Sequence, residues 1–254
     1  MIHIVGAGCG APDLITLRGK QYLEEADVII YAGSLVNPAL LAFAKKDCAV
    51  YDSAKMTLEE VLTVIESAEK EGKTTVRLHT GDPSLYGAIG EQMRAFDTCG
   101  FAYDITPGVS AFSGAAASLR AEYTLPDVTQ TLIITRMVGK TAVPEKERLR
   151  KLASHGTSLA LYLSTGLLKE VTEELLAAGL AENTPAAIVY KATWEEEKIC
   201  RCTVAALEQT ARENNIQKTA LIVLGDFLKS DFSRSRLYAP DFETEYRKVK
   251  HEEN

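Results

Sequence analysis

Residues 2–13 have the sequence IHIVGAGCGAPD, a short apolar run followed by a glycine-rich turn. Such a run predicts a buried strand that ends at a loop, and its G-x-G-x-x-A pattern matches the fingerprint of dinucleotide-binding folds. Two features argue against a dinucleotide. Pro12-Asp13 places a carboxylate where the pyrophosphate would lie, and the second predicted strand ends at residues 31–34 without an acidic residue for the ribose. A tight turn is an equally good interpretation, and NAD is disfavoured.

Further short apolar runs follow at regular intervals, and the segments between them carry helix signals. Asn37-Pro38 and Thr57-x-x-Glu60 predict helix starts. Pro144 is expected to open a helix over 145–152, and Thr165 to cap one over 167–178. This alternation of strands and helices predicts an α/β fold with a mostly parallel sheet. The strands are expected at residues 2–5, 28–31, 49–51, 75–78, 102–105, 131–135, 159–163, 186–190, 199–203 and 220–224.

The alternation breaks at residues 122–129, which show no clear period. We therefore expect two α/β domains, residues 1–120 and 121–229, each within the usual size of a domain. The remaining stretch, 230–254, is polar with charges of both signs, and it is expected to be a peripheral tail.

The composition limits the classes of partner and of site. The chain has 254 residues and a net charge of -7, which argues against nucleic acid or an anionic membrane as the main partner. No apolar run reaches the ~20 residues of a membrane span, so we expect a cytoplasmic protein. Five cysteines are scattered without a C-x-x-C pair, so neither a disulfide framework nor a metal site is expected. Cys200 and Cys202 are expected to be structural strand residues, and residues 195–197 a solvated acidic turn.

Two more loops follow predicted strands. Residues 79–87 read HTGDPSLYG, and residues 106–112 read TPGVSAF. Asp82 either caps the next helix or binds a ligand, and Ser110 can cap the helix that follows it. His79 alone is more often a packed histidine at a strand end than a catalytic base. No Walker A or G-x-S-x-G motif is present, so the sequence does not support P-loop or serine-hydrolase chemistry.

Together these three loops resemble those of the tetrapyrrole (corrin/porphyrin) methylase family, over roughly residues 1–228. Residues 26–36, ADVIIYAGSLV, and residues 81–89 resemble the subgroup that methylates carbon 11 of precorrin-4 or cobalt-precorrin-4 in cobalamin synthesis. The resemblance implies a mostly parallel sheet in the first domain, a mixed sheet in the second, and a ligand cleft between them. It also implies a homodimer that transfers a methyl group from S-adenosylmethionine to a tetrapyrrole.

The family's cofactor loops can be carried over position by position. Residue 163 departs from the family, because relatives often have methionine where this chain has leucine. The residues that the resemblance assigns to S-adenosylmethionine are Pro12, Gly81, Asp82, Leu85, Ser110, Ala111, Leu163, Ala192, Thr219, Ala220 and Leu221.

Because a precorrin carries many carboxylates, the resemblance also implies cations that bind the substrate. Arg18, Arg120, Arg136 and Lys191 flank the loops and are the candidates. The sequence does not single out a catalytic base. The alternatives are another methylase of the family, acting on uroporphyrinogen-III or another precorrin, a diphthine synthase, a non-catalytic protein that binds a nucleotide-like ligand, and an NAD-dependent oxidoreductase.

Overall fold

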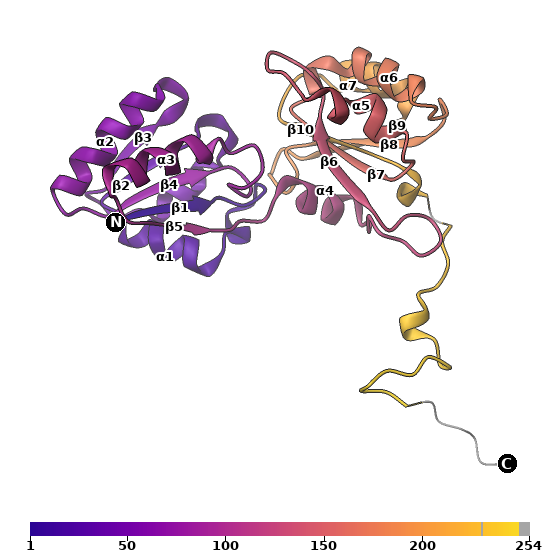
Figure 1. Cartoon of the computed structure of the whole chain (residues 1–254), viewed down its shortest axis with the longest axis horizontal. Coiled ribbons are helices and arrows are strands. Elements are labelled where there is room, and N and C mark those ends of the chain that lie inside the picture. Colours follow the sequence, from indigo (N-terminus) through magenta and orange to yellow (C-terminus); the bar gives the residue numbers. More distant parts are fainter. Residues whose placement is uncertain (230, 249–254) are drawn as a thin grey trace. The chain divides into compact units, whose positions relative to one another are not determined.

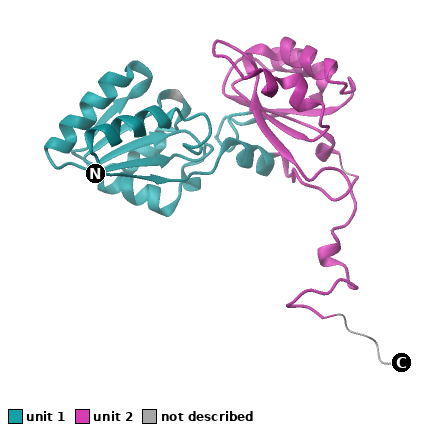
Figure 2. Ribbon diagram, in the orientation of Figure 1, with its two compact units in different colours: residues 1–118, 190–198 teal, residues 119–189, 199–254 magenta. Residues whose placement is uncertain are grey.

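The computed structural model describes residues 1–229 and 231–248, and the chain divides into two compact units (Figure 2). The first unit contains residues 1–118 and 190–198. The second contains residues 119–189 and the described residues from 199 onward. The return of residues 190–198 to the first unit is a feature that the sequence-based boundary near residue 120 did not anticipate.

The first unit is built on a five-stranded parallel sheet in the order β3-β2-β4-β1-β5 (Figure 1). Each strand lies within a residue or two of its predicted position, and the expected parallel sheet is confirmed. The strands are β1 (Ile2–Gly6), β2 (Val28–Tyr31), β3 (Ala49–Asp52), β4 (Thr75–His79) and β5 (Tyr103–Thr106).

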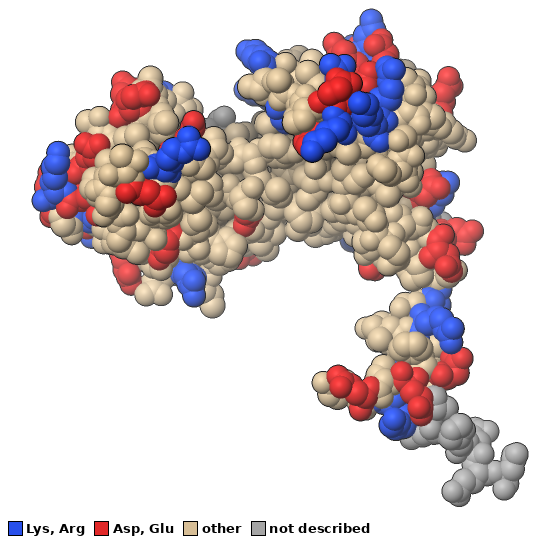
Figure 3. Space-filling view, viewed as in Figure 1, with Lys and Arg blue, Asp and Glu red and all other residues tan. Residues whose placement is uncertain are grey.

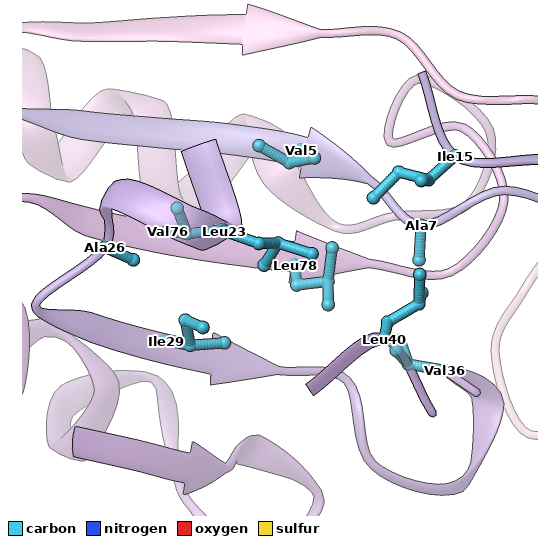
Figure 4. Close-up of a cluster of buried hydrophobic side chains, with 10 residues drawn as sticks. All are labelled: Val5, Ala7, Ile15, Leu23, Ala26, Ile29, Val36, Leu40, Val76 and Leu78. Carbon is cyan, nitrogen blue, oxygen red and sulfur yellow. The ribbon is translucent and has the colours of Figure 1, made fainter. Parts of the chain in front are cut away.

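Two apolar clusters cover the two faces of this sheet. On one face, the cluster drawn in Figure 4 packs Val5, Val76 and Leu78 against Leu23 of α1 (Leu17–Glu25). On the other face, Ile2 and Ile4 pack against α2 (Leu58–Lys70) and Phe96 of α3 (Ile89–Cys99). Because side chains alternate along a strand, the odd-numbered residues of β4 face α2 and α3.

The second unit has a mixed sheet, as the family resemblance implied. Its order is β6-β7-β10-β8-β9, with β6 and β7 parallel and β7 and β10 antiparallel. The strands are β6 (Leu132–Arg136), β7 (Ser158–Tyr162), β8 (Pro185–Tyr190), β9 (Lys198–Thr203) and β10 (Ala220–Leu224). The α-helices of this part of the chain are α5 (Leu149–Ala153), α6 (Leu168–Ala177) and α7 (Leu207–Glu213), and α6 contacts the other two.

Local signals at helix starts had mixed outcomes. Thr57 and Glu60 form the expected capping box. Asn37 caps as expected, but the helix it begins is the 3-10 helix η3 (Pro38–Phe43).

The two helix starts predicted in the second half of the chain differ from the expectation. Residues 145–152 form a 3-10 turn followed by α5, which begins at Leu149. Thr165 does not cap α6, because its hydroxyl donates to the carbonyl of Ala220 at 3.0 Å and so links the turn after β7 to β10.

In the tail, residues 231–248 contain a 3-10 turn, η9 (Arg236–Tyr238), and Arg247 donates to the carbonyls of Leu237, Ala239 and Phe242. Ser230 and residues 249–254 of the expected tail lie outside the described residues. In the part of the chain that the structure describes, no helix has the length and apolar character needed to cross a membrane.

Candidate functional site

The loops that follow β1, β4 and β5 meet at the carboxyl edge of the first sheet, where open α/β sheets bind ligands. A bridge joins Gly8 to Gly81, with Gly8 N–H donating to the Gly81 carbonyl at 3.2 Å and Gly81 N–H donating to the Gly8 carbonyl at 2.9 Å. The structure therefore brings together the three loops that the sequence analysis singled out.

Two glycines allow this close approach of the backbones. A Cβ atom on Gly108 would lie 2.1 Å from the Gly81 carbonyl oxygen, and one on Gly6 would lie 2.6 Å from the Gly108 nitrogen. Real Cβ atoms do not reach such distances, so any larger residue would push the loops apart. The glycines of the first and third motifs thus serve the packing of loop on loop.

Asp82 fastens the second loop to the third. Its Oδ2 accepts a hydrogen bond from Gly108 N–H at 2.9 Å, and its Oδ1 accepts from the Ser84 N–H at 2.9 Å and from the Ser84 hydroxyl. Burial alone would raise the pKa of Asp82, but the bonds from Ser84 and Gly108 outweigh it and hold this pKa below its usual value. Asp82 does not cap α3, whose cap position is Ala88.

The first loop does not have the geometry of a dinucleotide site. A 3-10 turn, η1 (Pro12–Leu14), follows the glycines, and α1 begins only at Leu17. The space beside Gly10 is filled, since a Cβ there would lie 2.3 Å from the ring of Trp194 and 2.5 Å from the Ala192 carbonyl. The 3-10 turn thus separates the glycines from the N-terminus of α1, which in a dinucleotide site would follow them directly and face the pyrophosphate. The glycines of this motif therefore form a tight turn and not a dinucleotide fingerprint.

Residues 190–198 form a fourth part of the site that the sequence analysis largely missed. Thr193 Oγ1 accepts a hydrogen bond from Ala11 N–H at 3.0 Å and lies 3.5 Å from Cys9 Sγ. Glu197 accepts from the Thr193 N–H at 2.6 Å and from the Ser118 hydroxyl. The expectation of a solvated acidic turn is therefore wrong for Glu197, whose carboxylate organises this segment. No local pattern marked this residue, because its partners are distant in sequence.

Buried polar groups lie below these loops at the ends of β4 and β5. His79 is 3% exposed, and burial, aided by the charge of Arg77, lowers the pKa of His79 to about 3. His79 is therefore a neutral, packed histidine, as expected. Within the described part of the chain, Nε2 of His79 and the hydroxyl of Thr106 have no hydrogen-bond partner.

Four exposed large apolar residues lie in the segments that follow β1, β2 and β4 in the sequence. The group comprises Leu14, Leu17, Leu35 and Tyr86.

The structure brings the predicted cofactor residues together in two sets. Pro12, Gly81, Asp82, Leu85, Ser110, Ala111 and Ala192 belong to the loops of the first unit. In the second unit, β7 and β10 are antiparallel, so Leu163 lies at the same sheet end as Thr219 and Ala220. Leu163 is 67% exposed, whereas Leu221 is buried in the sheet.

The four predicted substrate cations differ in their surroundings. The guanidinium of Arg136 donates to the carbonyls of Met137, Thr141 and Ala142. Lys191 pairs with Glu196 at 3.1 Å and lies 4.8 Å from the ring centre of Trp194. Arg18 is exposed on α1, and Arg120 lines a cavity of about 500 Å³ in the second unit.

Comparisons with known proteins agree with this geometry. The family model of the tetrapyrrole (corrin/porphyrin) methylases matches residues 1–208. The chain is 50% identical to a cobalt-precorrin-4 C(11)-methyltransferase of Methanocaldococcus jannaschii, covering 97% of this chain and 96% of that protein. It is 40% identical to a precorrin-4 C(11)-methyltransferase of Sinorhizobium, covering 97% of this chain and 98% of that protein.

A solved structure gives the same result for the fold. The X-ray structure of a cobalt precorrin-4 methyltransferase, described as a cobalamin biosynthetic enzyme, has a TM-score of 0.88 and 48% identity, covering 90% of this chain and 95% of that one. With the parallel and mixed sheets, the joined glycine loops and a family match over most of its length, the chain belongs to the tetrapyrrole (corrin/porphyrin) methylases.

Proposed function

We propose that this protein methylates carbon 11 of cobalt-precorrin-4 with S-adenosylmethionine, a step of cobalamin synthesis. The observation that carries the proposal is the identity of 50% and 46% with cobalt-precorrin-4 C(11)-methyltransferases of M. jannaschii and Priestia megaterium, over 97% of this chain in each case. The lower identity of 40% with the Sinorhizobium enzyme, named for precorrin-4, favours the cobalt-containing substrate.

The carboxyl edge of the first sheet suits S-adenosylmethionine. Close-packed glycine backbones, exposed apolar side chains and the unpartnered Thr106 hydroxyl offer the mixture of polar and apolar contacts that such a ligand needs. The first-unit residues that would hold it are Pro12, Gly81, Asp82, Leu85, Ser110, Ala111 and Ala192. Leu163 and residues 219–221 of the second unit are proposed as further contacts.

When bound, S-adenosylmethionine supplies an electrophilic methyl group on its sulfonium. The residues of the chain are then needed mainly to orient the two reactants and to exclude water. Asp82 serves this task by fixing the loop of residues 80–87 against Gly108. Among the predicted cations, Arg120 remains a candidate for binding a carboxylate of the substrate, because it lines a cavity together with Arg201 and Lys229.

The decisive experiment incubates the protein with S-adenosylmethionine labelled with ¹³C in its methyl group and with cobalt-precorrin-4 or precorrin-4. We expect one labelled methyl at carbon 11, located by NMR, and faster turnover of the cobalt substrate. A label at another ring carbon would reassign the substrate. Calorimetric titration with S-adenosylhomocysteine and NAD in parallel completes the test, since binding of NAD alone would refute methyl transfer.

The same resemblance supports a homodimer that acts in the cytoplasm. Sedimentation equilibrium on the purified protein measures the mass in solution directly. A mass equal to that of a single chain would rule out the dimer without affecting the proposed reaction.

A further inference from the structure

A cavity of about 250 Å³ lies in the first unit, beside the loop that carries Asp82. The first turns of α2 and α3 and the end of β4 line it, including Thr57, Arg77, His79 and Gln92. The cavity is smaller than the roughly 300–1,000 Å³ of sites for whole drug-sized ligands. It has room for a side chain of a ligand.

Among the described residues that line the cavity, Arg77 is the only buried side chain that carries a charge at neutral pH. The residue is only 7% exposed, its Nε donates to Gln92 Oε1 at 3.0 Å and its Nη1 donates to the Ile30 carbonyl at 3.0 Å. Both acceptors are neutral. In residues 1–229 and 231–248, no carboxylate lies within ion-pair distance of this guanidinium, and three of its five N–H donors have no acceptor.

An arginine without a counter-ion is unusual at this depth, because buried charges are normally paired. Burial lowers the pKa of Arg77 to about 10, so the group stays protonated at neutral pH. His79, two residues along the same strand, is neutral and supplies no balancing charge. Glu91 also lines the cavity, but it is exposed to solvent.

We propose that this cavity is a carboxylate subsite, in which Arg77 binds one carboxylate arm of the tetrapyrrole substrate. The remaining N–H donors of a guanidinium match the two oxygens of a carboxylate in a bidentate geometry. The proposal rests on the proposed function for the identity of the substrate. It assigns to Arg77 a role that the sequence analysis gave to other, more exposed cations.

Two variants test the subsite in opposite ways. Gln92→Glu supplies a carboxylate from the chain itself, about where the amide oxygen now accepts from Arg77. Arg77→Met removes the cation and retains an unbranched side chain. For both variants we expect a KM for the tetrapyrrole raised roughly ten- to a hundredfold, the effect of losing a hydrogen-bonded contact between charged groups. We expect kcat and the affinity for S-adenosylhomocysteine to remain near wild type.

Matched controls separate the subsite from general charge effects. Gln130→Glu adds the same charge at an exposed position, and Arg94→Met removes an exposed cation from α3. Both controls should keep the wild-type KM. A wild-type KM in Gln92→Glu and in Arg77→Met would overturn the proposal, as would an equal rise in the two controls.

Acetate provides a test that does not depend on the reaction. At constant ionic strength, rising acetate should increase the melting temperature of the wild-type protein and of the two controls, but not that of Gln92→Glu or Arg77→Met. If acetate raises the melting temperature in this pattern but the protein transfers no methyl group, the carboxylate site is supported and the proposed function is rejected. An equal acetate response in wild type, Gln92→Glu and Arg77→Met would overturn the subsite.

Discussion

At the scale of single residues, Asp82 is a positioning group. All the observed hydrogen bonds of its carboxylate come from Ser84 and Gly108, so this carboxylate holds the shape of two loops. The sequence predicted the importance of Asp82 but left open whether it caps a helix or binds a ligand. The answer needed Gly108, which lies 26 residues away and joins Asp82 only because β4 and β5 end at the same sheet edge.

Asp82→Asn should weaken the site although it keeps the shape of the side chain. An amide group would face either the Gly108 N–H or the Ser84 N–H, so that one donor would oppose another. We expect the unfolding free energy to fall by about 1–3 kcal/mol and the affinity for S-adenosylhomocysteine to fall with it. Denaturant unfolding and calorimetry measure the two effects, with the exposed Asp47→Asn as control.

The lowered pKa of Asp82 fixes the sign of its dependence on pH. A carboxyl group whose pKa is lower in the folded state stabilises the protein above its unfolded value of about 3.9, and this stabilisation is lost as the pH falls through the folded value. Unchanged stability and affinity in Asp82→Asn would remove this residue from the site.

His79 should make the protein sensitive to mild acid. Its pKa is about 3 in the folded state and 6.5 in the reference state, so below pH 6.5 the unfolded chain binds a proton that the folded chain does not. Between pH 7 and pH 5, we expect His79 to remove about 2 kcal/mol of unfolding free energy. Urea unfolding of wild type, His79→Gln and the exposed control His155→Gln measures this. An equal loss in all three would contradict it.

At the scale of elements, short apolar runs predicted the strands well, because strands such as β1, β4 and β10 are buried along nearly their whole length. The capping box at Thr57 was also predictable, since its partner Glu60 lies in the first turn of the same helix. Thr165 and Glu197 were not, because their partners Ala220 and Ser118 lie 55 and 79 residues away. Tertiary partners, and not local propensity, decide what these side chains do.

The contact of residues 190–198 with the first loop can be tested by a pair of glycine variants. Gly10→Ala would drive a methyl group into Trp194, so we expect lower stability and weaker binding of S-adenosylhomocysteine. Gly90→Ala, in the first turn of α3 with open space around it, should stabilise by up to about 1 kcal/mol. Thermal unfolding and calorimetry compare the two. Equal effects would show that Gly10 is not packed as described.

At the scale of the whole molecule, the net charge of -7 and a polyanionic substrate oppose each other. Acidic and basic side chains are interspersed on the face drawn in Figure 3. The proposed carboxylate subsite overcomes this repulsion locally, because a buried arginine in a small cavity attracts one carboxylate whatever the total charge of the protein. The composition excluded a large basic surface, but it could not predict Arg77, because burial and the lack of a counter-ion exist only in the folded chain.

This opposition predicts an unusual response to salt. The net charge repels the substrate over about 30 Å at 0.01 M salt but only about 8 Å at 0.15 M, whereas the buried contact with Arg77 is screened much less. We therefore expect kcat/KM for the tetrapyrrole to rise several-fold between these concentrations. Binding of zwitterionic S-adenosylhomocysteine should stay constant. A steep fall of kcat/KM would instead show that exposed cations such as Arg18 and Arg120 attract the substrate.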